Sequence, residues 1–261
     1  PTNNIANFLN DTALPTTNIL GRVTGGNPSN IYGTIQTTGF GSANLYLINP
    51  AGVIFGAGAS LNVGGAFRVS TADYVRMNDG AKFYANLTST SELSSAPVVA
   101  FGFLSGNPTG ITATSTGLAP LLEVPVGNTL TLVGGNLDIN GPSSSVSPTL
   151  QARSGRIELV SVASAGEVLL AAEGGTPAFS TTGFATLGNV MVNSGARVTV
   201  AAVPAVPQSS VPGGFTSPAG TIVIRAGRLT VDGASSLIAS TGGNTNAAPM
   251  AVDIQARTAV T

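Results

Sequence analysis

Residues able to perform acid–base or nucleophilic chemistry are few and scattered in this sequence. The 261 residues include eleven acidic and ten basic side chains, with no histidine and no cysteine. The nearest carboxylate pair is Asp73 with Asp79, which flank Arg76. General acid–base catalysis needs two carboxylates, or a carboxylate and a cation, held together on one face. Asp79 is followed by Gly80, a pair typical of a solvated turn, so we predict no catalytic residue.

Metal and cofactor sites are not predicted either. Histidine is the commonest metal ligand and cysteine the other frequent one, and the chain has neither. Serines and threonines are numerous but have no neighbouring base that would activate them. Gly56-Ala57-Gly58 and Gly64-Gly65 do not fit a phosphate-binding loop and precede no helical pattern, so we interpret them as turns. We therefore expect no metal and no cofactor.

The low charge of the chain limits its partners. Charged residues make up 8% of the sequence and the net charge is −1. The basic residues form no stripe that could neutralise phosphates, so we expect no nucleic acid partner. No apolar run approaches the roughly 20 residues that span a bilayer, and we expect no stable membrane insertion. Regularly spaced Val, Ile and Leu favour a folded chain over a disordered one.

Short apolar runs separated by turn residues dominate residues 44–71. Leu45 and Leu47 share one side of an extended segment, and Val53 and Phe55 share one side of the next. Asn-Pro and Gly separate the runs, after which the alternation resumes. This repeated pattern of strand, tight turn and strand is typical of a β-solenoid.

Segments with the same rhythm recur along the rest of the chain. Each starts with a glycine and continues into alternating apolar residues; the starting points are Gly127, Gly155, Gly188 and Gly220. Coils of roughly 20 to 30 residues with three short strands each fit this spacing. Val and Thr favour strands, and no amphipathic helical pattern persists. The sequence therefore predicts an all-β fold, a parallel β-helix with three short strands per coil, as a single domain over residues 1–261.

Two stretches interrupt this rhythm. We predict that residues 86–125 form extra-helical strands lying on the helix, because they carry an alternation of their own. It comprises Val98, Val99, Phe101 and Phe103. Residues 204–218 are rich in Pro, Ser and Gly, and we predict a surface loop there. The residues before Thr261 include none that would close a strand edge, so we expect coils to continue beyond it in the natural polypeptide.

The turn formed by Asn49, Pro50, Ala51, Gly52 and Val53 is the best candidate functional feature. Pro50 fixes the backbone angle φ at the second turn position, the Asn49 side chain can bond the turn, and Gly52 relieves strain after it. A structural role and a recognition role are compatible in one turn, and both stay open.

A second candidate turn lies upstream, at Asn27, Pro28 and Ser29. We interpret it as another turn of the Asx type, in which the asparagine side chain bonds the backbone.

The same residues carry a family resemblance. Residues 49–53 resemble the NPNGI motif in the N-terminal secretion domain of two-partner secretion exoproteins, the filamentous-haemagglutinin-like family, with Ala51 at the second Asn of the motif. Residues 22–31 resemble the segment before that motif, and residues 122–127 and 155–159 resemble later coils. The resemblance implies a right-handed β-helix in which residues 1–35 are a remnant of the N-terminal cap and the first coil.

For function, the resemblance implies the secretion domain of a large exoprotein. An outer-membrane β-barrel transporter would recognise it through periplasmic transport-associated (POTRA) domains. The main candidate for the contact is the Asn49 turn, and the secondary candidate is the Asn27 turn. Folding of the helix would then be nucleated outside the cell. We expect a monomer that is secreted or held at the cell surface, and no enzyme activity.

An alternative is a structural adhesin whose β-helix itself binds a surface or a carbohydrate. Exposed aromatic side chains would serve such binding, and the candidates are Phe101, Phe103, Tyr32, Tyr46, Tyr74 and Tyr84. We expect instead that the phenylalanines pack in the core and that the tyrosines line the coil edges.

Overall fold

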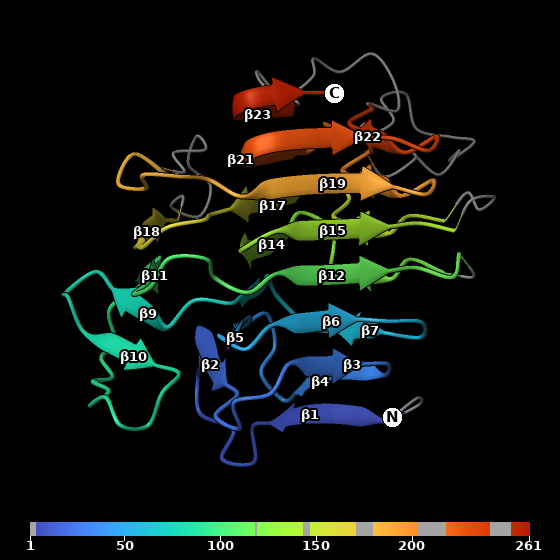
Figure 1. Cartoon of the computed structure of the whole chain (residues 1–261). Coiled ribbons are helices and arrows are strands. Elements are labelled where there is room, and N and C mark those ends of the chain that lie inside the picture. Colours follow the sequence, from blue (N-terminus) through green and yellow to red (C-terminus); the bar gives the residue numbers. More distant parts are fainter. Residues whose placement is uncertain (1–3, 118, 143–146, 171–179, 203–217, 241–251) are drawn as a thin grey trace, which may run out of the picture.

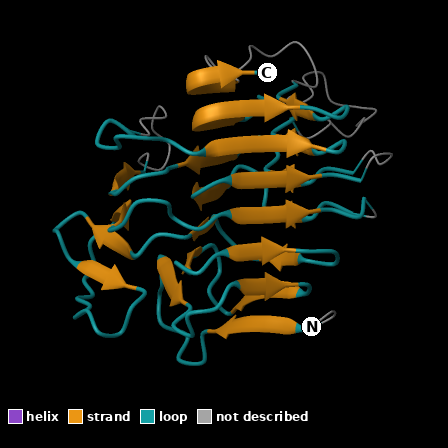
Figure 2. Cartoon of the chain, in the orientation of Figure 1, coloured by secondary structure: helices purple, strands orange, loops and turns teal. Residues whose placement is uncertain are grey.

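Strands, turns and irregular segments make up the whole of the described chain. The structure is a computed structural model that describes residues 4–117, 119–142, 147–170, 180–202, 218–240 and 252–261. Over these ranges it contains 23 strands and no helix (Figure 2). No helix long and apolar enough to cross a membrane is therefore found in that part of the chain.

Most strands wind around one axis and form three faces (Figure 1). Face 1 consists of β2 (Asn18–Arg22), β5 (Asn44–Ile48), β8 (Phe67–Ser70), β14 (Thr129–Gly134), β17 (Arg156–Ser161) and the first part of β21 (Thr221–Val231). Face 2 consists of β3 (Ser29–Ile31), β6 (Val53–Phe55), β12 (Ile111–Thr114), β15 (Leu137–Asn140), β19 (Asn189–Asn193) and the second part of β21.

Face 3 contains two separate sheets. The first consists of β1 (Ile5–Leu9), β4 (Thr34–Thr38) and β7 (Ser60–Asn62). The second consists of β13 (Leu122–Glu123), β16 (Leu150–Gln151), β20 (Arg197–Thr199) and β22 (Ser236–Ile238). The last strand, β23 (Val252–Val260), pairs with β21 along both of its parts.

Parallel pairing stacks equivalent residues of successive coils on one another. On face 1, Leu45 pairs with Phe67, Phe67 with Leu130, Leu130 with Ile157 and Ile157 with Ile222. In Figure 1 the near strands of face 2 run from left to right while the chain climbs from the N-terminus, which is the sense of a right-handed coil. The predicted all-β parallel β-helix is confirmed.

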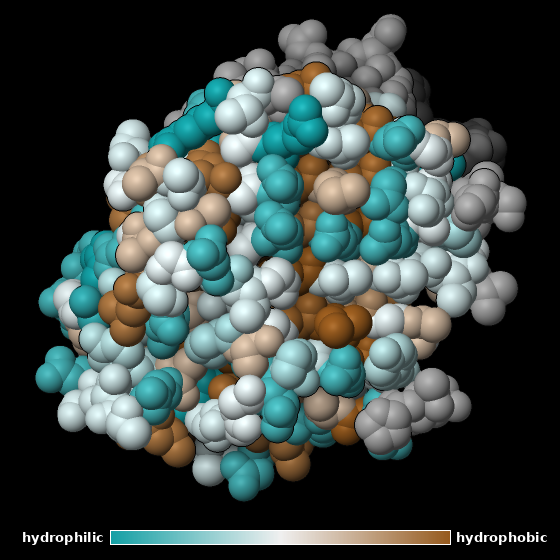
Figure 3. All heavy atoms as spheres, in the orientation of Figure 1, coloured by the Kyte–Doolittle hydropathy of each residue, from teal (hydrophilic) through white to brown (hydrophobic). Residues whose placement is uncertain are grey.

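The core of the helix is a ladder of aliphatic and phenylalanine side chains. Side chains alternate between the two sides of a strand, so every second residue of each face points to the axis. Leu45, Phe55, Phe67, Leu132 and Val190 are among those with no exposed surface. On face 2 the other side faces solvent (Figure 3), where polar side chains dominate and hydrophobic ones form small groups.

An antiparallel sheet lies outside the coils. Its strand order is β10 (Lys82–Tyr84), β9 (Tyr74–Met77), β11 (Val98–Phe103) and β18 (Gly166–Leu169). The first three strands come from the connection between β8 and β12, and β18 follows β17 two coils later. Two insertions that are far apart in sequence therefore build one sheet.

The strands divide the predicted excursion at residues 86–125. β11 belongs to the outer sheet, whereas β12 and β13 lie in the coils, where they pair in parallel with β6, β15 and β16. The outer sheet also begins earlier, with β9. Strands of both kinds carry the same alternation, so the sequence pattern does not reveal which partner each strand takes.

A second core fills the space between the outer sheet and face 1. Tyr46, Ile48, Val133 and Val160 point outward from face 1 and pack against a cluster that includes Phe101. Strands β5, β8, β14 and β17 are consequently covered on both sides.

This core also buries three of the aromatic side chains in question. Phe101 and Phe103 are buried, but here rather than inside the helix, and Tyr46 is buried with them. Tyr74 is buried too, but on the opposite side of the outer sheet, against Glu167 and Tyr84. Tyr32 is exposed. The expected position of the tyrosines at coil edges was wrong for Tyr46 and Tyr74.

The N-terminal segment follows the same stacking as later coils. Within residues 1–35, β1 pairs with β4, β2 with β5 and β3 with β6, all in parallel. The loop predicted at residues 204–218 lies, except for Pro218, outside the described residues.

Candidate functional site

The turn at Asn49 joins face 1 to face 2 at one corner of the helix. The Asn49 Oδ1 atom accepts a hydrogen bond from the Ala51 amide at 3.0 Å, and the Gly52 amide donates to the Asn49 carbonyl at 3.0 Å. Gly52 has φ of 113°, a backbone region that favours glycine. Val53 then enters β6 with its side chain in the core. The predicted Asx-type β-turn is therefore formed.

The second candidate turn lies directly against the first, but the predicted Asx turn is not formed there: the Asn27 side chain donates to the Gly25 carbonyl at 3.3 Å instead of accepting from the Ser29 amide. The Asn49 Nδ2 atom donates to the Asn27 carbonyl at 3.0 Å and to the Ser29 Oγ atom at 2.8 Å. The Ser29 amide donates to the Gly52 carbonyl at 2.9 Å. Asn49 itself is only 1% exposed. Its side chain thus connects the two turns from inside, and every polar atom of its amide group has a partner.

A third Asn-Pro turn stacks on the other side, and our sequence analysis missed it. Residues 107–111 read Asn-Pro-Thr-Gly-Ile, with the same spacing of Asn, Pro, Gly and an aliphatic residue as residues 49–53. Ile111 pairs with Val53. The Thr109 hydroxyl donates to the Pro50 carbonyl at 2.5 Å, and the Thr109 carbonyl accepts a hydrogen bond from Thr71 Oγ1 at 2.7 Å. The repeated spacing was the signal that could have revealed it.

These three turns present one continuous surface at the corner. Asn27, Pro28 and Thr109 are exposed, and Pro50 and Ala51 are half-buried. We call these five residues the stacked-turn surface. Beside it lies a cavity of about 420 Å³. Its lining residues include Val23, Asn49, Pro50, Ala51, Asp73 and Asn86. The stacked-turn surface carries no charge, so it can offer shape and hydrogen bonds but no ion pair.

The acids singled out at Asp73 and Asp79 have structural partners. The Asp73 carboxylate accepts the Leu104 amide at 2.7 Å. Asp79 closes a turn through the Ala81 amide, and hydrogen bonds from Ser94 and from that amide lower the pKa of the Asp79 carboxyl. Arg76 pairs with neither of them. Within the described residues no group of three acids, histidines or cysteines gathers that could hold a metal ion.

Arg76 instead pairs with Glu167 across the outer sheet. The Arg76 Nη2 atom lies 2.9 Å from Glu167 Oε2, and the Tyr74 hydroxyl donates to Glu167 Oε1 at 2.8 Å. Burial alone would raise the pKa of Glu167, but the hydrogen bonds from Arg76 and Tyr74 outweigh it and hold this pKa below its usual value. Burial and the neighbouring carboxylate raise the pKa of Tyr74. This trio ties β18 to β9.

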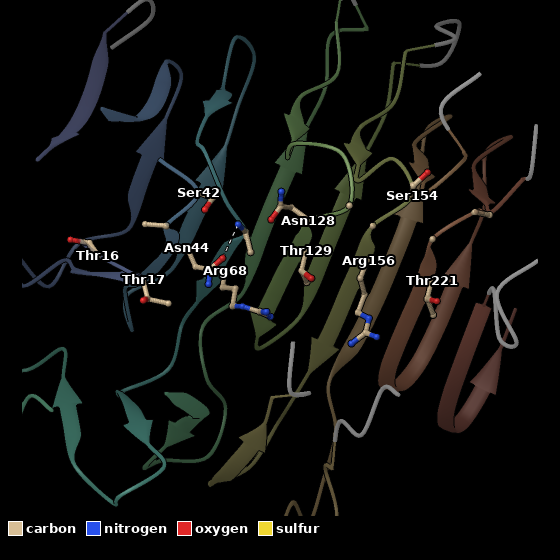
Figure 4. Close-up of a pocket in the computed structure, with 16 residues that line it drawn as sticks. Thr16, Thr17, Ser42, Asn44, Arg68, Asn128, Thr129, Ser154, Arg156 and Thr221 are labelled. Carbon is tan, nitrogen blue, oxygen red and sulfur yellow. Dashed lines mark hydrogen bonds between the residues drawn. The ribbon is translucent and has the colours of Figure 1, made fainter. Parts of the chain in front are cut away.

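A buried ion pair crosses three coils on the outward side of face 1. Arg68 Nη1 lies 3.0 Å from Glu158 Oε2, and both residues are at most 3% exposed. Thr131 stands between them in the ladder and bonds both. Burial raises the pKa of Glu158, although the charge of Arg68 opposes this. Figure 4 shows Arg68 and Arg156 among the residues that line a groove of about 580 Å³, where face 3 leads into face 1. No sequence motif predicts this ion pair, because Arg68 and Glu158 are distant along the chain.

Comparison with known proteins identifies the family. Neither a search of curated proteins nor a search of solved structures found a match. The family model described as "TPS secretion domain" matches residues 1–211, which include all three turns of the stacked-turn surface. That family comprises secretion domains and is not a known enzyme family. The chain belongs to the TPS secretion domain family, the secretion domains of two-partner secretion exoproteins.

Proposed function

We propose that this domain is recognised in the periplasm by the POTRA domains of its outer-membrane transporter, and that the stacked-turn surface makes the contact. Membership of the secretion domain family supports the partner. The observation that carries the proposed site is the buried Asn49 side chain, which holds two turns together so that Pro28, Pro50 and Ala51 form one surface. The adjacent cavity gives a partner side chain a place to insert.

Within this proposal the motif residues have different roles. Asn49, Gly52 and Val53 are buried and shape the corner, whereas Pro50 and Ala51 are accessible to the transporter. An uncharged contact of this kind should depend little on ionic strength, because salt screens charges and not shape. Asn27 and Pro28 supply the second part of the contact.

The test is binding of the chain to the isolated POTRA domains, in the folded state and after unfolding in urea. Ala51→Glu places a charge on the stacked-turn surface, and the matched control is Ala165→Glu, at an exposed position in the turn between β17 and β18. We expect the first variant to bind more weakly and the second to bind as the unchanged chain does. Equal binding by both variants would place the recognised surface elsewhere.

We further propose that the domain is exported across the outer membrane and that its coils nucleate folding outside the cell. In this proposal only the corner at Asn49, whose turns lie in neighbouring coils, is already formed when the POTRA domains bind it. Each coil packs on its neighbour through parallel ladders, so folding can proceed coil by coil. Leu132→Asp, which places a carboxylate in the core, should block folding and slow secretion. Secretion of that variant at the unchanged rate would show that folding does not drive export.

A further inference from the structure

The tripeptide Asn-X-Ser/Thr, in which X is not proline, is the acceptor motif for transfer of a sugar to an asparagine side chain. The chain contains this motif at Asn10-Asp11-Thr12 and at Asn86-Leu87-Thr88. So short a motif often arises by chance. The structure around each asparagine therefore decides whether a sugar can be attached there.

The Asn86 side chain keeps its amide nitrogen free. Asn86 lies in the connection between β10 and β11, and Asn86, Leu87 and Thr88 are all exposed. The Thr88 amide and the Thr88 hydroxyl both donate to Asn86 Oδ1 at 3.0 Å. A backbone amide can only donate, so the atom that faces it is the oxygen and not the nitrogen. Within the described part of the chain, Asn86 Nδ2 has no hydrogen-bond partner.

Asn10 is held differently, although its motif is the same. Asn10 Nδ2 donates to the Leu14 carbonyl at 2.9 Å and to the Gly39 carbonyl at 3.2 Å. An amide nitrogen carries two hydrogens, and both are used here. The Asn10 backbone amide also donates to the Thr38 carbonyl at 2.9 Å, which fixes the half-buried residue to the next coil. Attachment of a sugar to Asn10 would break at least one of these bonds, whereas attachment to Asn86 breaks none.

The surroundings of Asn86 leave room for a sugar. Leu87 and Leu93, in the same connection, have 63% and 68% of their surface exposed. A sugar on Asn86 would therefore extend from a surface loop and displace no packed side chain. It would also add polar groups beside two exposed leucines, as surface glycosylation generally does.

We propose that Asn86 is a site of N-linked glycosylation and that Asn10 is not modified in the folded chain. The donor is a hexose activated by a nucleoside diphosphate, used by a glycosyltransferase. Asn86 Nδ2 forms a bond to the anomeric carbon of the hexose, and the bond between that carbon and the diphosphate oxygen breaks. The nucleoside diphosphate leaves with the electron pair of that bond, and one amide proton passes to a base of the transferase. The Thr88 hydroxyl is the second group of the motif that the transferase recognises.

The test is incubation of the folded chain with a soluble N-glycosyltransferase and uridine diphosphate glucose. Mass spectrometry of the intact chain and of its peptides then counts the added hexoses and locates them. A synthetic acceptor peptide in a parallel reaction shows that the transferase is active. We expect a single added hexose, on Asn86. A folded chain without a hexose, or one modified on Asn10 to the same extent as on Asn86, would overturn the proposal.

Variants at Asn86 and Thr88 locate the site. Asn86→Gln should abolish the modification, whereas Asn78→Gln, which changes an exposed asparagine outside the motif, should leave it unchanged. Thr88→Ser keeps the hydroxyl and should still be modified. Thr88→Ala should reduce the modified fraction about tenfold or more, as expected for the loss of a recognised hydrogen-bonding group. A hexose that persists in Asn86→Gln, or equal modification of Thr88→Ala and Thr88→Ser, would contradict this site.

A further variant separates the effect of the fold on Asn10 from the effect of the residue that follows it. Asp11→Leu gives the first motif the same middle residue as the second, at an exposed position. Asn10 should stay unmodified in this variant, because its amide nitrogen still holds the Leu14 and Gly39 carbonyls. A hexose on Asn10 would show that Asp11, and not these bonds, prevents modification. Urea denaturation of each variant checks that it folds.

Discussion

Asn49→Ala separates the structural role of the motif from its proposed recognition role. The substitution removes three hydrogen bonds of a side chain that is 1% exposed, those to Asn27, Ser29 and Ala51. Each such bond contributes about 1 kcal/mol, and a partner left unsatisfied costs more. We expect the free energy of unfolding to fall by about 2–4 kcal/mol, measured by urea denaturation.

The control is Asn62→Ala, which removes the hydrogen bond of an exposed side chain to Gln36 on face 3. It should cost less than about 0.5 kcal/mol. Asn49→Asp keeps the shape and the bond from Ala51 but places a carboxylate against the Asn27 carbonyl.

At neutral pH the aspartate variant should be at least as unstable as Asn49→Ala. The neighbouring carbonyl raises the pKa of the new carboxyl in the folded state above its unfolded value. The loss of stability caused by Asn49→Asp should therefore become smaller as the pH falls, because the folded protein accommodates the protonated carboxyl better than the charged one. A loss below about 1 kcal/mol in Asn49→Ala, close to that of Asn62→Ala, would refute the argument that Asn49 connects the turns.

Three further outcomes can be measured on the same chain. Arg68→Met should cost about 3 kcal/mol, the low end of the range for breaking a buried ion pair, because Arg156 still lies 3.7 Å from the Glu158 carboxylate. Arg68→Met with Glu158→Met should restore most of this loss, and a double variant as unstable as the single one would argue against the ion pair. Glu167 has a pKa below its usual 4.5, so it stabilises the fold above that pH, and this contribution is lost as the pH falls. Glu167→Gln should therefore flatten the pH dependence of the free energy of unfolding on the acid side. An unchanged pH profile would contradict this expectation. Gly102→Ala should loosen the outer sheet, because the new Cβ atom would collide with the ring of Tyr74, and near-ultraviolet circular dichroism should report the displaced tyrosine.

Much of the fold follows from local sequence pattern. The alternation at Leu45, Leu47, Val53 and Phe55 sets both the strands and the side that faces the core, and the Asn49 turn forms as its residue types indicate. Parallel stacking then follows, because each coil has the same apolar positions. These features depend on residues within one or two coils of each other.

What could not be predicted depends on pairing between distant segments. β11 and β18 pair although they belong to different coils, and the sequence of residues 166–169 does not indicate that β11 is the strand they pair with. Arg68 and Glu158 are 90 residues apart and become neighbours only through the stacking of β8, β14 and β17. The third Asn-Pro turn was visible in the sequence, but its place on Pro50 depends on where β12 rejoins the coils.

The outer sheet imposes an order on folding. Neighbouring coils contact each other over short stretches of chain, and such local contacts form early. β11, by contrast, pairs with β9 within its own coil but with β18, residues 166–169, only after two more coils have formed. Until then the hydrophobic outer side of face 1, including Ile48 and Val133, lacks part of its cover. If the coils form in sequence order, β18 pairs with β11 late in folding. This pairing completes the outer sheet and joins coils that until then could form and unfold separately, so that they unfold together.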